Sequence, residues 1–272
     1  MKSLRIFPEG SYIKGINFES DIQHNLFVYV LPSNVNKEEV NILLLSEPDV
    51  ISGLVKSLPS FYQNFDIILT HNEEVLSKYA NARLFVFNSI WASNKDYSPK
   101  EFSISTIVGN KLWTKQQVMR QELWAIQDEI KNRKFFASSV GPPANTFGNP
   151  SIGDNKDDLF KSQFHIAIEN CCIKNFFTEK ILDCFISKTV PIYCGCINIG
   201  DFFNENGIIK FNNIRECVDI CNKIDEKSYE KFAPYIEENY NKALEYLDWQ
   251  KRIKDIIVNF KSNKTLFLNN IV

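Results

Sequence analysis

The sequence lacks several features that would identify a protein at once. No stretch of its 272 residues approaches the roughly 18 apolar residues of a membrane-spanning helix. Its first ten residues, MKSLRIFPEG, lack the apolar core of a secretory signal peptide. The net charge is only −2, whereas nucleic-acid-binding proteins are usually basic. We therefore expect a cytoplasmic protein that does not bind nucleic acid.

Cysteines are absent from the first 170 residues, and the seven that follow all lie between Cys171 and Cys221. An odd number in one part of the chain argues against a secreted disulfide framework. No pair has the C-x-x-C spacing of common zinc sites, and Cys217 and Cys221 are one turn apart in an expected helix. We expect reduced, structural cysteines and no metal ion.

The apolar residues form short segments separated by helical patterns. The apolar content of 44% and the charged content of 24% are typical of a globular protein. Strand-like segments occur at Leu26–Leu31, Asn41–Leu45, Phe65–Thr70, Ser103–Val108, Lys134–Val140 and Val190–Tyr193. Strands that alternate with helices indicate an α/β fold with parallel sheets. A polar segment at residues 91–102 divides the chain, which predicts domains at 1–97 and 98–248, followed by a helix and tail at 249–272.

The segment from Phe164 to Gly195 has the most informative pattern. A short apolar run, Phe164–Ile168, is followed by Glu169 and Asn170, then by a loop that ends at Thr178. Thr178 is expected to begin a helix, with Glu179 and Lys180 in the first turn. In a right-handed strand–helix–strand unit, the strand end and the helix N-terminus lie at the edge where α/β sheets bind ligands.

The chemistry of this segment suits a nucleotide diphosphate. A helix N-terminus attracts phosphate, and Lys180 adds a full positive charge there. The carboxylate of Glu179 can accept hydrogen bonds from the two hydroxyls of a ribose. The alternative is that Thr178 is an ordinary helix cap and that Glu179 and Lys180 are solvated first-turn residues.

The same segment resembles the α-1,3-fucosyltransferases, the family-10 glycosyltransferases. The shared pattern is E-N-x7-T-E-K followed by V-P-I-Y-x-G, and Asp183 also falls in register. The bacterial and viral members are the better comparison. The resemblance implies a GT-B fold of two Rossmann-like domains with an interdomain cleft, an inverting mechanism and no active-site metal. It implies that GDP-fucose is the donor substrate and that no cofactor is tightly bound.

Two further residues enter through this resemblance. Glu47 follows the apolar run Asn41–Leu45 and precedes Pro48, the position of the proposed general base in the family. The other reading is a loop acid beside a proline turn. Arg120 lies near the register of the family arginine that contacts the donor diphosphate, and a guanidinium can bind two phosphate oxygens. The alternative for Arg120 is a surface side chain paired with Glu122.

Arg120 belongs to an expected helix that begins at Thr114. Gln117 follows three residues later, as in a capping box, and apolar residues at Val118, Leu123, Ile126 and Ile130 recur near helical spacing. Residues 141–153 contain three glycines and three prolines without a helix or strand period. We expect this segment to be a loop, either a lid over the donor or a plain excursion.

The resemblance implies that the donor site comprises Arg120, Glu169, Asn170, Phe176, Thr178, Glu179 and Lys180, with Glu47 as the catalytic base. Phe176 and Cys194 replace residues with which the family shapes the donor pocket. Transfer of another nucleotide-deoxysugar, or a carbohydrate-binding relic without activity, therefore stays open. The partners would be the donor and an acceptor glycan.

The C-terminal segment Trp249–Phe260 has the pattern of an amphipathic helix. Lys251, Arg252 and Lys254 lie among its apolar residues. We expect the helix either to pack back on the first domain or to make weak peripheral contact with the inner face of a membrane. The oligomeric state is not predicted.

Overall fold

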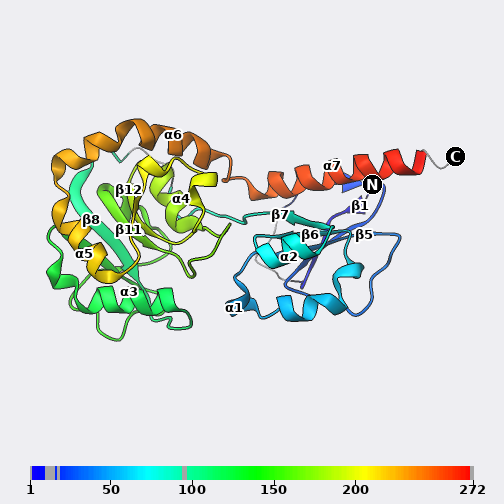
Figure 1. The fold of residues 1–272 in the computed structure, drawn as a ribbon, viewed down its shortest axis with the longest axis horizontal. Helices are drawn as coiled ribbons and strands as arrows, with labels where there is room; N and C mark the ends of the chain where they lie inside the picture. Colours follow the sequence, from blue (N-terminus) through cyan, green and yellow to red (C-terminus); the bar gives the residue numbers. More distant parts are fainter. Residues whose placement is uncertain (1, 10–15, 17–18, 94–96, 270–272) are drawn as a thin grey trace. The chain divides into compact units, whose positions relative to one another are not determined.

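The computed structural model describes residues 2–9, 16, 19–93 and 97–269, with side chains as far as residue 260. The chain forms two compact units, the first made of Met1–Phe87 with Asp248–Val272 and the second of Asn88–Leu247 (Figure 1). The sequence placed the corresponding boundaries after residues 97 and 248. Residues 94–96, within the expected linker, lie outside the described part.

The first unit contains a five-stranded parallel sheet. Its strands, in spatial order, are β2 (Arg5–Phe7), β4 (His24–Val28), β5 (Val40–Leu45), β6 (Ile67–Thr70) and β7 (Ala82–Leu84). A separate antiparallel pair joins β1 (Lys2–Ser3) to β3 (Glu19–Ser20). Strands β4, β5 and β6 are buried along their whole length, as expected for a parallel sheet covered on both faces.

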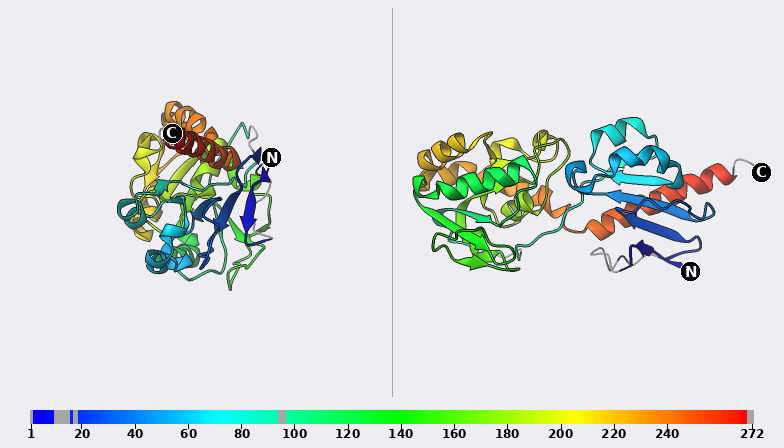
Figure 2. Two further views of the ribbon diagram at one scale, coloured as in Figure 1. Left: turned by 90° about the vertical axis from the view of Figure 1, so that its right-hand side faces the viewer. Right: turned by 90° about the horizontal axis from the view of Figure 1, so that it is seen from below.

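Different parts of the chain cover the two faces of this sheet. Spatial order follows chain order, so right-handed connections all lie on one face. That face carries α1 (Asp49–Ser52), η1 (Val55–Ser60), η2 (Tyr62–Asn64) and α2 (Glu73–Lys78). The opposite face packs against α7 (Trp249–Asn269), whose Ile253 and Ile257 are fully buried with Leu26 and Ile42 (Figure 2). The apolar face of the predicted C-terminal helix therefore belongs to the core of this unit.

The second unit contains six parallel strands. Their spatial order is β10 (Ser151–Ile152), β9 (Arg133–Ser138), β8 (Glu101–Val108), β11 (Ser162–Ile168), β12 (Val190–Cys194) and β13 (Ile209–Lys210). The chain winds outward from β8 in one direction, then returns to β11 and winds in the other. The point between β8 and β11 is the topological switch point, where such sheets bind ligands.

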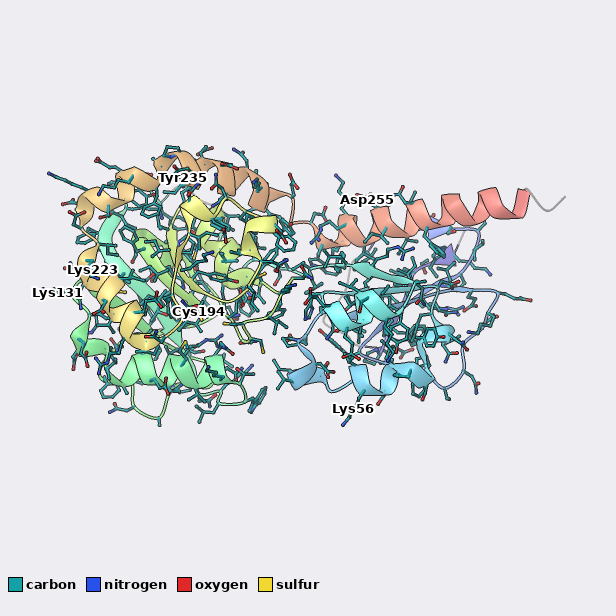
Figure 3. All side chains as sticks on the ribbon, viewed as in Figure 1. Lys56, Lys131, Cys194, Lys223, Tyr235 and Asp255 are labelled. Atoms are coloured by element: carbon teal, nitrogen blue, oxygen red, sulfur yellow. The ribbon has the colours of Figure 1, made fainter. Side chains whose placement is uncertain are left out.

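Helices cover both faces of this second sheet. They are α3 (Lys115–Ala125), α4 (Glu179–Ile186), α5 (Ile214–Lys223) and α6 (Ala233–Leu244), with short turns η3 (Gln127–Glu129), η4 (Asp157–Lys161), η5 (Ile199–Asp201), η6 (Glu205–Gly207) and η7 (Glu226–Phe232). Because the winding reverses at the switch point, right-handed connections place α3 and α4 on opposite faces. Exposed charged side chains such as Lys131 and Lys223 surround an interior that includes Cys194 (Figure 3).

Two details of the expected secondary structure were wrong. Helix α3 ends at Ala125, and its buried apolar residues are Met119, Leu123 and Trp124, whereas Val118 is 39% exposed. Apolar residues continue at near-helical spacing beyond Ala125, so the sequence pattern did not distinguish the helix from the tighter turn at Gln127–Glu129 that follows it. Residues 141–153 are not all loop, because Ser151–Ile152 pairs with the edge of β9. A strand of two residues is too short to show the alternation of apolar and polar residues by which strands are predicted.

No helix in the described part of the chain is both long and apolar enough to cross a membrane.

Candidate functional site

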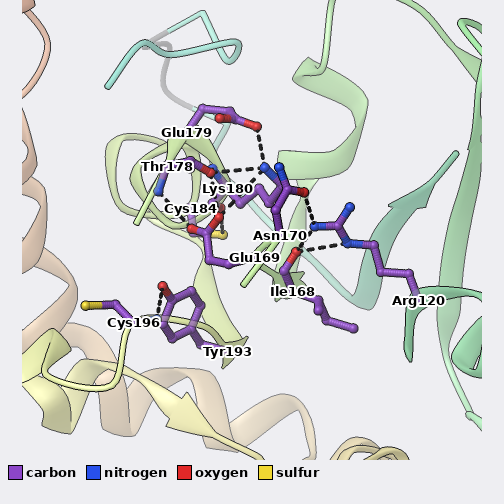
Figure 4. Close-up of polar contacts among 10 residues, drawn as sticks. All are labelled: Arg120, Ile168, Glu169, Asn170, Thr178, Glu179, Lys180, Cys184, Tyr193 and Cys196. Atoms are coloured by element: carbon purple, nitrogen blue, oxygen red, sulfur yellow. Dashed lines mark hydrogen bonds and ion pairs between the residues drawn. The ribbon is translucent and has the colours of Figure 1, made fainter. Parts of the chain in front are cut away.

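Glu169 anchors the loop that leads from β11 to α4. It follows β11 directly and is fully buried. Its two carboxylate oxygens accept hydrogen bonds from Thr178, one from the backbone N–H at 2.8 Å and one from the hydroxyl at 2.7 Å (Figure 4). A side chain at Gly195 would clash with Glu169 and Tyr193, which explains the glycine of the motif. These contacts fix Thr178 as the cap of α4.

The first turn of α4 carries a compact charged group. Lys180 Nζ donates hydrogen bonds to Glu179 Oε1 at 2.7 Å and to Thr178 Oγ1 at 3.0 Å, and it lies 3.8 Å from Glu169 Oε2. Burial alone would lower the pKa of Lys180, but the carboxylates of Glu179 and Glu169 outweigh it and the pKa is raised. Burial raises the pKa of Glu169. Lys180 is therefore held as a cation at the positive end of the helix dipole.

Arg120 reaches the same place from α3. Its Nε donates to the carbonyl oxygen of Ile168 at 3.0 Å, and its Nη2 donates to that oxygen and to Asn170 Oδ1, the latter at 2.9 Å. No described residue accepts a hydrogen bond from Nη1. Burial lowers the pKa of Arg120, but a guanidinium remains protonated at any physiological pH. Arg120 thus presents a fixed positive charge with donor capacity to spare.

A cavity of about 430 Å³ lies at the switch point between β8 and β11. Residues of β8 and β11 line it, together with Arg120, Glu179 and Lys180. Its remaining charged lining residues are Lys111, Asp154, Lys156 and Asp183. Four cationic and three acidic side chains therefore face one cavity, next to a helix N-terminus. That combination can hold a polyanion that also carries hydroxyl groups.

The structure brings most of the predicted donor-site residues together, but in different roles. Arg120, Glu179 and Lys180 line the cavity. Glu169 and Thr178 support the helix turn from beneath, through the hydrogen bonds given above. Asn170 accepts from Arg120. Phe176 is only 3% exposed and is not among the residues that line the cavity.

Glu47 belongs to the first unit. It is exposed and lies directly after β5, between the buried residues Ser46 and Pro48. Ser46 is hydrogen-bonded through its hydroxyl to Tyr29. The carboxylate is thus carried by a short, well-packed turn at the C-terminal end of a central strand.

Asp183 is a cavity residue that was not among the site residues expected from the sequence. It lies on the buried side of α4, is 3% exposed and accepts hydrogen bonds from the backbone N–H groups of Trp91 at 2.9 Å and Ala92 at 3.2 Å. Burial raises its pKa to about 7. The available signal was a single acid in the otherwise apolar run of α4, one turn after Glu179. Lys156, whose Nζ lies 5.6 Å from the ring centre of Trp91, was also missed.

Within the described residues, no group of three or more histidine, cysteine or acidic side chains is arranged to hold a metal ion.

The C-terminal part of the chain matches a known family. Residues 141–269 match the model described as glycosyltransferase family 10 (fucosyltransferase) C-term. This segment is therefore similar to glycosyltransferase family 10. It contains Glu169, Thr178 and Lys180, and it extends through α7. The family resemblance drawn from the sequence is thereby confirmed.

A curated relative supports the family-10 assignment. The α-(1,3)-fucosyltransferase FucT of Helicobacter pylori is 26% identical over 142 residues. The match covers 48% of this chain and 29% of that protein. The matched part of the chain therefore spans less than a third of the length of this curated relative.

Solved structures agree on the fold. An α1,3-fucosyltransferase bound to GDP-fucose superposes with a TM-score of 0.51 at 16% identity, covering 83% of this chain and 71% of that one. TarM gives 0.54 at 12% identity, with coverages of 87% and 54%. A trehalose-phosphate synthase from Burkholderia vietnamiensis gives 0.55 at 10% identity, with coverages of 90% and 73%. The predicted fold, GT-B with two Rossmann-like domains, is confirmed.

Proposed function

We propose that the protein transfers L-fucose from GDP-fucose to a hydroxyl group of an acceptor glycan, with inversion at the anomeric carbon. The observation that carries this proposal is the cationic cavity at the N-terminus of α4, inside a family-10 segment. The choice of donor is supported by the solved structure of an α1,3-fucosyltransferase with GDP-fucose, which is similar in fold.

The donor would bind with its diphosphate between Arg120 and Lys180. Both cations line the cavity, and the N–H groups of the first turn of α4 add further donors. Glu179, which shares the cavity wall, would accept hydrogen bonds from the ribose hydroxyls. Glu169 and Thr178 would act through Lys180, by holding the turn that presents it.

Catalysis would require one base and one stabilised leaving group. Glu47 would take the proton of the acceptor hydroxyl as its oxygen attacks the anomeric carbon. The bond from that carbon to GDP breaks, and negative charge develops on the diphosphate. Arg120, Lys180 and the helix dipole would stabilise that charge, because they are already fixed in place before the reaction.

One observation favours a second candidate, transfer of another nucleotide-linked deoxysugar. Phe176 is buried and offers no hydroxyl, and Cys194 occupies the end of β12 beside Cys172, at an Sγ–Sγ distance of 3.3 Å. In the resembled family these positions help to shape the donor pocket, whereas here neither Phe176 nor Cys194 is among the residues that line the cavity. The identity of the sugar that is transferred is therefore a separate question from whether the protein is a transferase.

The test compares two variants with matched controls. Lys180→Ala should lose nucleotide affinity and turnover together, whereas Glu47→Ala should lose turnover and keep GDP affinity. Lys223→Ala and Glu38→Gln change exposed residues of the same two units and should behave as the wild type. Turnover near the wild-type value in Glu47→Ala would remove the base assignment. Measurable transfer in the wild type would rule out a non-catalytic relic.

A further inference from the structure

Among the described residues, one carboxylate oxygen of a residue that lines the cavity receives no hydrogen bond from the protein. Asp183 is 3% exposed, and its Oδ1 accepts from the N–H groups of Trp91 and Ala92. In the described part of the chain, no donor is hydrogen-bonded to Oδ2. Asp183 nevertheless lines the cavity. A carboxylate held by two backbone N–H groups therefore offers its second oxygen to whatever fills the space.

A carboxylate oxygen that lines a cavity can accept a hydrogen bond from a ligand, and hydrogen bonds to charged groups are stronger than those between neutral groups. Lys156 and Lys180 act on Asp183 only through space, because neither makes a hydrogen bond to it. The group that best satisfies Oδ2 is thus a hydrogen-bond donor on the ligand. Such a hydrogen bond would form only when the ligand binds.

The position of Asp183 on α4 indicates which part of a nucleotide would meet it. Glu179 and Asp183 are four residues apart, so they share one face of the helix about 6 Å apart along its axis. If Glu179 holds the ribose, as in the function proposed above, the base attached to that ribose extends along the same wall. Leu159 and Phe160, both 2% exposed, also line the cavity and supply apolar contacts for a flat ring.

The bases differ in what they present to a lone carboxylate oxygen. Guanine carries two adjacent donors, the N1–H and the 2-amino group. Uracil has a single N–H between two carbonyl oxygens, which would repel a carboxylate. Adenine carries an acceptor at N1. We propose that Asp183 reads the N1–H and 2-amino edge of a guanine base and so sets the base specificity of the donor site.

The test measures dissociation constants for four diphosphates, GDP, IDP, XDP and ADP, by titration calorimetry. Inosine lacks the 2-amino group, and xanthine has a carbonyl oxygen in its place. The wild type should bind GDP about 10- to 100-fold more tightly than XDP or ADP, with IDP in between. This comparison needs no variant, so it stands even if a substitution impairs folding.

Asp183→Asn then tests the residue itself. The amide oxygen can still accept from Trp91 and Ala92, while the amide N–H2 faces the base in place of Oδ2. GDP affinity should fall about 10- to 100-fold, and XDP affinity should rise, which inverts the preference. Asp158→Asn makes the same chemical change at an exposed site that does not line this cavity and should leave the order of affinities unchanged.

The outcomes separate this inference from the proposed function. An unchanged GDP-to-XDP ratio in Asp183→Asn would mean that Asp183 only anchors Trp91 and Ala92, and the donor assignment would survive without it. Equal wild-type affinities for GDP, IDP and XDP would overturn base reading in the same way. Wild-type selectivity for ADP, or the binding of no diphosphate, would overturn both.

Discussion

Removal of the Glu169 carboxylate should destabilise the second unit and weaken its nucleotide site together. Glu169→Ala removes a fully buried carboxylate, which leaves the N–H of the half-buried Thr178 without its acceptor and takes a negative charge from beside Lys180. Breaking a buried charged pair by removing one partner costs about 3–5 kcal/mol. Burial raises the pKa of Glu169, which shows that desolvation offsets part of the attraction between Glu169 and Lys180. We therefore expect a loss of stability at the lower end of this range, about 3 kcal/mol.

The assay is a thermal melt followed by circular dichroism, with and without GDP. For a unit of about this size, 1 kcal/mol shifts the melting temperature by roughly 2–4 °C, so Glu169→Ala should melt roughly 6–12 °C lower. Glu169→Gln keeps one acceptor for Thr178 and should lose about a third as much, on the order of 1 kcal/mol. A Glu169→Ala protein that melts within 1 °C of the wild type, a margin of about 0.3–0.5 kcal/mol, would refute the supporting role of this carboxylate.

Three further predictions concern charge, donor geometry and packing. The folded-state pKa of Asp183 is about 7 against 3.8 for the free side chain, so the folded protein holds this proton more tightly than the unfolded chain does. Stability should therefore fall as pH rises from about 4 to 7, and the melting temperature of Asp183→Asn relative to the wild type should be higher at pH 8 than at pH 5; a constant difference would contradict this. Arg120→Lys removes the planar fork that meets Ile168 and Asn170, and should weaken GDP binding about 10- to 100-fold while Arg133→Lys does not. Ile257→Ala should cost about 2–5 kcal/mol in the first unit; an unfolding transition unchanged by this substitution would show that α7 is not part of that core.

The parts of the site that lie close together in the sequence were predictable. Glu169, Thr178 and Lys180 are separated by a strand end, a loop and a cap, all of which have local signals. The strand–helix–strand order placed the helix N-terminus at the ligand edge of the sheet. Arg120 reaches the site from another helix, and only its register in the resembled family indicated it.

The parts that depend on distant contacts were not predictable in the same way. Asp183 is held in place by hydrogen bonds from the backbone N–H groups of Trp91 and Ala92, which are more than 90 residues away in the sequence. The sequence left two roles open for Trp249–Phe260, since an amphipathic pattern does not say what covers it. The structure shows that Ile253 is buried in one core cluster with residues of the first sheet. Strand Ser151–Ile152 and the end of α3 are too short for a repeating pattern of apolar residues, so the sequence did not predict them correctly.

The most direct test of the account is thermal stabilisation of the wild type by a panel of GDP, GDP-fucose, UDP, CDP and ADP. A ligand at about 100 times its dissociation constant should add about 2.7 kcal/mol to the stability of the folded state. The account predicts a clear rise in melting temperature with GDP and GDP-fucose, and none of that rise in Lys180→Ala. Stabilisation by UDP or CDP alone would contradict the fucose donor, and the absence of any shift would contradict the nucleotide site at α4.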